Sequence, residues 1–414
     1  MRTEPHHFSP LIDGLRRAQL RDLGFLGLLL AAGALAFFIL RSPAKPAGDF
    51  VYFYSIGRLL SERSSLDLYN YQAQQAEYDK LRPDLHGSLG PSPYPPFVAL
   101  FFRPFARLPF FVAHRIWMVV TLCLYLAGLW LLLRTFLPDR RVYWPAALSA
   151  ALLFWPFLGR TFAPGQITAA GFFAMSVALC EQERQHYYMS GLALSLCLYK
   201  PTLLVWILPL LVITRAWRTL AGFSIGAVLL ACITTCAFHS TSIWRQYLGM
   251  MTYFAHIRSF LIRSDYVDIL AMAGLATDRA LSTAATGISL CAGAAVMFLA
   301  WRRVLSGADE HRIVSAWTVT LPLALLVNVY TPIYDSVLVV VSLIASARLL
   351  QHIAQHWLIF GCLLLLASSC CTTWIAEIWH IQIFSFMILG ISALQLSQVN
   401  GRRVPVQIPL ANAV

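Results

Sequence analysis

The chain has 414 residues, of which 58% are hydrophobic and 12% are charged, and its formal net charge is +12. Soluble domains carry about 25% charged residues, so this composition excludes an ordinary soluble enzyme of this length. Apolar runs long enough to cross a bilayer core, which takes about 20 residues, recur along the chain. We therefore expect a single integral membrane domain, 1–414, of the all-α polytopic class.

The first span is expected at 22–40, after a basic N-terminus that includes Arg16, Arg17 and Arg21. The run is too long for the apolar region of a secretion signal, so we expect it to remain uncleaved. Eleven further spans make about twelve in all. They are predicted near 111–133, 142–158, 166–181, 187–199, 201–214, 219–238, 284–301, 313–329, 335–350, 356–373 and 379–397.

Two connections are far longer than the others, at 41–110 and 239–283. Such long loops are usually functional or disordered, and their aromatic and aliphatic residues indicate order here. Helices are predicted at 50–62 and 70–82. The first is amphipathic, which is typical of a helix lying on the membrane surface or on the protein. The proline-rich stretch 91-PSPYPPFVALFFRPFARLPF-110 is expected at the membrane interface.

The basic residues predict the orientation. If the N-terminus is cytoplasmic, most arginines between spans fall on the cytoplasmic side, and the short outer connections receive only Arg160 and Lys200. Both termini are then cytoplasmic, and both long loops lie outside. The positive charge is therefore topological, and no nucleic-acid partner is expected. The short loops favour a bacterial inner membrane.

Two charged residues at outer span ends have competing explanations. Asp49 follows the first span and precedes the predicted helix at 50–62, which it could cap. Lys200 stands between two short apolar runs, where a charge is costly unless it reaches water or a partner. It could extend to the membrane rim, or it could bind an anion such as a lipid phosphate.

Other polar residues occur at further outer turns, and each has a structural alternative. Arg160 and Gln166 flank the tight turn 161-TFAPG-165, where they could be ordinary turn polars. Asp265 and Asp268 could form a solvated helix start, and Asp335 could cap the next helix. The set predicted to line an outer cavity is Tyr94, Gln166, Asp265, Tyr334 and Asp335, together with Asp49, Arg160 and Lys200.

These residues suggest one chemistry. A carboxylate can take a proton from an acceptor hydroxyl that it contacts. Cations can stabilise the charge that develops on a departing phosphate. Because nucleotides do not reach the outer side, a lipid-linked donor is the sensible energy source. Sugar transfer from a lipid phosphate fits this combination, although spacing alone does not establish it.

Several stretches carry a resemblance to a known family. They are 48-GDFVYFYSIGRLL-60, 66-LDLYN-70, 94-YPPFVALFFRPFARLP-109, 165-GQITAAGFFAMSVAL-179 and 191-GLALSLCLYKPTLLVWILPLL-211. In order and spacing they resemble the polytopic GT-C glycosyltransferases, most closely glycosyltransferase family 87.

The resemblance implies a GT-C-like bundle with helical outer loops. It implies that Asp49 is the catalytic base and that Lys200 contacts the donor phosphate. Apart from the resemblance, Arg160 is our second candidate for a cation near that phosphate. Gly165-Gln166 would lie near the donor or the acceptor. The implied donor is a polyprenyl-phosphate sugar, typically mannose, and the implied reaction is a single inverting displacement onto an outer-face lipid or glycan. No metal or other cofactor is implied.

The chain departs from the family pattern at 330-YTPIYD-335, where some members carry histidines, and at 263-RSDYVDIL-270. These departures leave the acceptor and the sugar open. A flippase or transporter of a lipid-linked or amphipathic solute is the alternative function. It explains the many spans but not the two long outer segments. A non-catalytic scaffold is a third hypothesis, under which Asp49 is only a cap.

Overall fold

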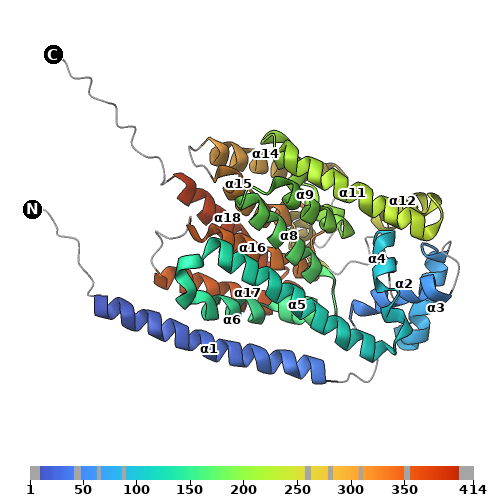
Figure 1. Cartoon of the computed structure of the whole chain (residues 1–414), viewed down its shortest axis with the longest axis horizontal. Helices are drawn as coiled ribbons and strands as arrows, with labels where there is room; N and C mark the ends of the chain where they lie inside the picture. The colour runs from blue at the N-terminus through green and yellow to red at the C-terminus, as the bar shows by residue number, and fades with distance from the viewer. Residues whose placement is uncertain are drawn as a thin grey trace, which may run out of the picture.

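A computed structural model describes residues 10–41, 48–62, 67–85, 90–256, 263–277, 283–306, 311–348 and 355–400. Its elements are helices joined by short turns (Figure 1). The helices are α1 (Pro10–Leu40), α2 (Phe50–Glu62), α3 (Tyr71–Leu81), α4 (Pro96–Phe102), α5 (Phe110–Phe136), α6 (Trp144–Leu153), α7 (Trp155–Phe157), α8 (Thr168–Glu183), α9 (Tyr187–Ser195), α10 (Ile207–Ile213), α11 (Trp217–Phe238), α12 (Ser242–His256), α13 (Ile269–Thr277), α14 (Thr283–Leu305), α15 (Arg312–Val327), α16 (Leu338–Ala345), α17 (Gln355–Trp379) and α18 (Ile383–Asn400).

Within the described residues, each of the twelve predicted spans overlaps a helix or a helix extended by a short turn, and residues 349–350 of the predicted span 335–350 lie outside the described ranges. Within the described ranges, five stretches are long and apolar enough to cross a membrane: Ala18–Leu40, Phe110–Phe136, Trp217–Phe238, Thr286–Leu305 and Ile359–Trp379. A pair bent by 49°, Pro138–Leu153 and Trp155–Phe162, makes a sixth if it is one span. The all-α polytopic membrane class is confirmed, whereas the number twelve stays a prediction.

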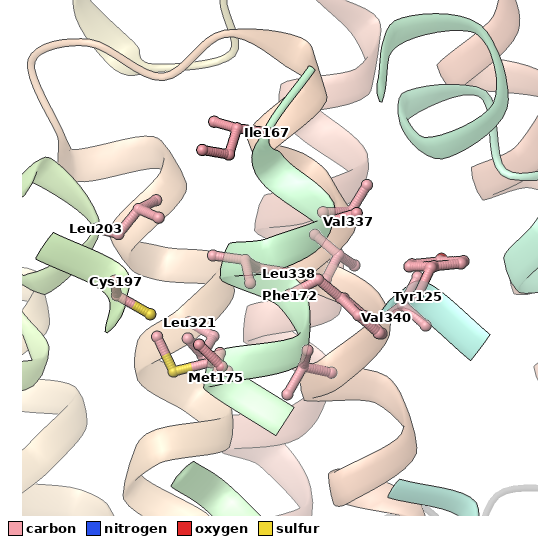
Figure 2. Packing of buried hydrophobic residues seen from close by; sticks show 14 of the residues in the cluster. Tyr125, Ile167, Phe172, Met175, Cys197, Leu203, Leu321, Val337, Leu338 and Val340 are labelled. Carbon is pink, nitrogen blue, oxygen red and sulfur yellow. The ribbon is translucent and has the colours of Figure 1, made fainter. Parts of the chain in front are cut away.

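The long helices pack through small residues and a continuous apolar core. α9 and α11 meet where a side chain on Gly191 would collide with the Thr219 carbonyl, and one on Gly222 with the Tyr188 carbonyl. Gly222 and Gly226 form a G-x-x-x-G spacing, which allows helix backbones to approach closely in membranes. Figure 2 shows the core around α8, where Phe172 and Met175 lie among apolar side chains of neighbouring helices.

The two long segments gather at one end of the bundle. In Figure 1, α2, α3, α4 and α12 lie together at the right, while α1 begins at the opposite end. α2 and α3 confirm the helices predicted at 50–62 and 70–82, and Asn70 caps α3 by accepting hydrogen bonds from Gln72 and Ala73 N–H at 3.0 and 3.3 Å. Which end faces the cytoplasm remains a prediction, and residues 1–9 and 401–414 lie outside the described ranges.

α2 packs against the rest of the protein over most of its length. Eight of its thirteen residues are buried, including the polar residue Ser55. The Tyr54 hydroxyl donates to the Leu108 carbonyl at 2.7 Å, which ties α2 to the turn before α5. This packing fixes the start of α2, where Asp49 lies.

Candidate active site

Asp49 is held in place by two loops that press against each other. Gly48 and Gly165 have positive φ angles of +79° and +75°, a conformation that side chains rarely adopt. A Cβ on Gly48 would lie 2.6 Å from the Pro164 Cα, and one on Gly165 would lie 2.8 Å from the Phe50 Cβ. The Phe50 N–H donates to the Pro164 carbonyl at 2.9 Å. Only glycines permit this contact, which sets Asp49 beside Gln166.

Gln166 orients the Asp49 carboxylate. Its Nε2 donates to Asp49 Oδ2 at 3.0 Å, while its Oε1 accepts from the Ile167 N–H at 2.8 Å and from the Tyr94 hydroxyl at 3.3 Å. These two donors fix the amide, so its NH₂ group faces Asp49. No hydrogen bond from the described residues reaches Asp49 Oδ1, including from the first turn of α2. That oxygen is therefore available to a substrate hydroxyl.

The surroundings shift the acidity of Asp49, which lies outside the apolar spans. Burial raises its pKa from 3.8 to about 6. The hydrogen bond from Gln166 and the positive charges of Lys200 and Arg160 oppose this rise, and the negative charge of Asp265 adds to it. A carboxylate with a pKa near neutrality can take up a proton from a substrate and release it again at working pH.

Lys200 is buried and has an internal partner, so it does not need to reach water for its charge to be compensated. It lies where Pro201 interrupts the chain between two helical turns, because the residue before a proline is disfavoured in α conformation. Its Nζ donates to Asp335 Oδ2 at 2.5 Å and lies 4.6 and 5.0 Å from the ring centres of Tyr334 and Tyr330. Asp335 therefore neutralises a lysine and does not cap a helix, contrary to the structural alternative.

Arg160 is held from two distant parts of the chain. It lies in a π-helical turn, Leu158–Phe162, a distortion often found at functional sites. Its Nη2 is 2.8 Å from Asp265 Oδ1 and donates to the Thr373 hydroxyl at 2.7 Å. Asp265 is therefore not simply a solvated helix start. Its neighbour Asp268 does begin a helix, but it is buried and accepts from the Ala271 and Thr331 N–H groups.

These side chains share one cavity of about 610 Å³, which lies where the two long segments meet the bundle. Seven of the predicted site residues line it: Asp49, Tyr94, Arg160, Gln166, Lys200, Asp265 and Tyr334. Asp335 is fully buried and does not line the cavity, but it pairs with Lys200, which does. The cavity thus combines two carboxylates, two cations and hydrogen-bonding aromatic rings, which suits a sugar bearing an anionic leaving group.

Sequence reasoning missed several tyrosines and one threonine. Tyr52, Tyr199, Tyr266 and Tyr330 also line the cavity, and Thr373 binds Arg160. The tyrosines stand within four positions of a predicted site residue in the sequence, which was an available signal. Thr373 lies within an apolar span, and nothing in its local sequence indicates a role.

Among the described residues, no group of three or more His, Cys, Asp or Glu side chains could hold a metal ion.

The comparisons with known proteins give one match. The model of glycosyltransferase family 87 matches residues 93–328, a range that holds Tyr94, Arg160, Gln166, Lys200 and Asp265 but begins after Asp49. No curated protein and no solved structure matches the chain. Because the matched range covers more than half of the chain, the protein belongs to glycosyltransferase family 87.

Proposed function

We propose that this membrane glycosyltransferase moves a hexose, with mannose the first sugar to test, from a polyprenyl-phosphate donor to a hydroxyl of a lipid or glycan on the outer face of the membrane. The observation that carries the proposal is the single cavity that holds the Asp49 carboxylate together with Arg160 and Lys200. Family membership supports a transferase over the flippase and scaffold alternatives.

The proposed reaction is one displacement. The acceptor hydroxyl approaches Asp49 Oδ1, because Gln166 occupies Oδ2. Asp49 takes the proton while the acceptor oxygen bonds to the anomeric carbon. The bond from that carbon to the phosphate oxygen breaks, and the phosphate keeps the electron pair. A single displacement inverts the anomeric centre and needs only one carboxylate.

The cations stabilise the leaving group as its charge grows. A phosphodiester with one negative charge becomes a phosphomonoester with a second developing charge, which positive side chains in a sheltered cavity stabilise. Lys200 gives one of its three ammonium hydrogens to Asp335, so it keeps donors for a substrate. The tyrosine rings lining the cavity provide flat apolar faces and hydroxyls for a sugar ring.

A donor comparison tests the proposal. The purified protein in lipid nanodiscs is given octyl α-mannoside as acceptor and, in separate reactions, polyprenyl-phosphate-mannose, polyprenyl-phosphate-glucose, polyprenyl-diphosphate-mannose or GDP-mannose. We expect a new disaccharide only with a polyprenyl-monophosphate donor, with the anomeric configuration opposite to that of the donor. Transfer from GDP-mannose, or retention of configuration, contradicts the proposal. Transbilayer movement of an intact donor without transfer supports the transporter alternative instead.

A further inference from the structure

The two ion pairs of the cavity differ in their access to solvent. The side chains of Lys200 and Asp335 are only 10% and 1% exposed, and the Lys200 ammonium lies against the rings of Tyr330 and Tyr334. The side chains of Arg160 and Asp265 are 31% and 32% exposed, and both residues line the cavity. An anion that enters the cavity can therefore reach Arg160 and Asp265 and separate them from each other.

The free energy needed to break each ion pair follows its exposure: the exposed pair is easier to break than the buried pair. A partly exposed ion pair contributes at most about fivefold to an equilibrium constant, because water replaces much of the interaction. Removing one partner of a buried pair costs more than about a hundredfold, because the other charge is left without compensation. Asp265 can therefore leave Arg160 at small cost, whereas Asp335 cannot leave Lys200.

Arg160 stays in position when Asp265 leaves. The Thr373 hydroxyl in α17 accepts from Arg160 Nη2 at 2.7 Å and also donates to Asp265 Oδ1 at 3.3 Å. Thr373 thus gives the guanidinium a second anchor besides the carboxylate. Arg160 Nε is buried and has no hydrogen-bond partner among the described residues. A guanidinium offers five N–H donors in a planar fork, which matches two oxygens of a phosphate.

The charge of the cavity also favours an exchange. Two cations, Arg160 and Lys200, face three carboxylates, those of Asp49, Asp265 and Asp335. An anion added to this set would meet a surplus of negative charge. An anion that takes the place of the Asp265 carboxylate keeps the charge of the Arg160 guanidinium compensated before and after the exchange. The freed carboxylate can turn toward water, because its side chain is already one third exposed.

We propose that Asp265 occupies the phosphate site of the free protein, and that the donor phosphate binds Arg160 by displacing it while Lys200 remains paired with Asp335. This inference rests on the proposed function, because it takes a polyprenyl-phosphate donor as the ligand. It assigns the phosphate to Arg160 as its principal contact and gives Asp265 the role of a competing internal anion.

A double-mutant cycle tests the exchange. Binding of radiolabelled undecaprenyl phosphate is measured in nanodiscs for the wild type, Asp265→Asn, Arg160→Gln and the double variant, after thermal unfolding has shown that each is folded. We expect Asp265→Asn to tighten binding by up to about fivefold and Arg160→Gln to weaken it by about tenfold or more. In the Arg160→Gln background, Asp265→Asn should change the affinity less than 1.5-fold, since the guanidinium for which Asp265 competes with the phosphate is gone. Arg160→Met serves as a second neutral variant if the glutamine variant does not fold.

Three outcomes overturn the inference. If Asp265→Asn tightens binding equally in both backgrounds, Asp265 acts only through the general charge of the cavity. If it leaves the wild-type affinity unchanged or weakens it, Asp265 does not compete with the phosphate. If the wild type does not bind undecaprenyl phosphate, the proposed donor class fails as well, which distinguishes failure of the proposed function from failure of the exchange alone.

Discussion

Replacing Asp49 with asparagine should make the protein more stable at neutral pH. The folded protein holds the proton of Asp49 more tightly than the unfolded chain does, since burial raises the pKa from 3.8 to about 6. Each pKa unit corresponds to 1.36 kcal/mol, so the ionised carboxylate costs about 3 kcal/mol of folding free energy above pH 6. An asparagine keeps an oxygen that can accept from Gln166 and carries no charge to desolvate.

The sign of the pH dependence follows from the same linkage. Between about pH 4 and pH 6 the folded state binds more protons than the unfolded state, so the free energy of unfolding of the wild type falls as the pH rises. Below pH 4 both states are protonated at Asp49, and the penalty vanishes. The Asp49→Asn variant lacks this contribution at every pH. The two proteins should therefore be similar in stability near pH 4 and should diverge toward pH 7.

The assay is thermal unfolding of the detergent-solubilised protein, followed by tryptophan fluorescence from pH 4 to pH 8. For a chain of this size, about 3 kcal/mol corresponds to a rise in Tm of roughly 3 °C for Asp49→Asn at pH 7.5. Asp22→Asn, which removes an exposed carboxylate from α1, is the matched control. A lower Tm for Asp49→Asn at pH 7.5, or a difference that does not change with pH, would refute the account of a carboxylate destabilised by burial.

Three further predictions concern catalysis and folding. The logarithm of kcat/KM should rise with a slope near one as the pH increases toward about 6 and then level off, because Asp49 must be ionised to accept a proton; a flat profile from pH 5 to pH 7 contradicts this role. Lys200→Met should lower the free energy of unfolding by about 3–5 kcal/mol, because Asp335 is left buried without its cation, and Lys200→Met with Asp335→Leu should recover most of that loss in chemical denaturation. Gly165→Ala should cost about 1–3 kcal/mol through its positive φ and also reduce transfer, whereas Gly33→Ala, which meets no neighbouring atom, should do neither.

The fold class was predictable because it depends on local signals. Long uncharged runs indicate membrane helices wherever they occur, and the amphipathic pattern of 50–62 predicts α2. The burial of α2 was not predictable. Its amphipathic pattern says that one side is apolar, but only the neighbouring elements decide whether Ser55 meets solvent or protein.

The charged members of the candidate site were predictable, but four of its tyrosines and the partners of its charges were not. Lys200 and Arg160 were notable as charges at the ends of apolar runs, where a cation needs a partner. Those partners lie 135 positions away, at Asp335, and 213 positions away, at Thr373. No periodicity or spacing connects residues so far apart, and an alternative such as a helix cap explains each acid equally well until the fold brings it beside a cation.

The most direct measurement is sugar transfer by Asp49→Asn, with polyprenyl-phosphate-mannose and octyl α-mannoside in nanodiscs and with binding of undecaprenyl phosphate measured on the same preparation. We predict that transfer falls by at least about a hundredfold, in line with the loss of a general base, while the affinity for undecaprenyl phosphate changes less than threefold. Transfer within about threefold of the wild type contradicts the assignment of Asp49 as the base.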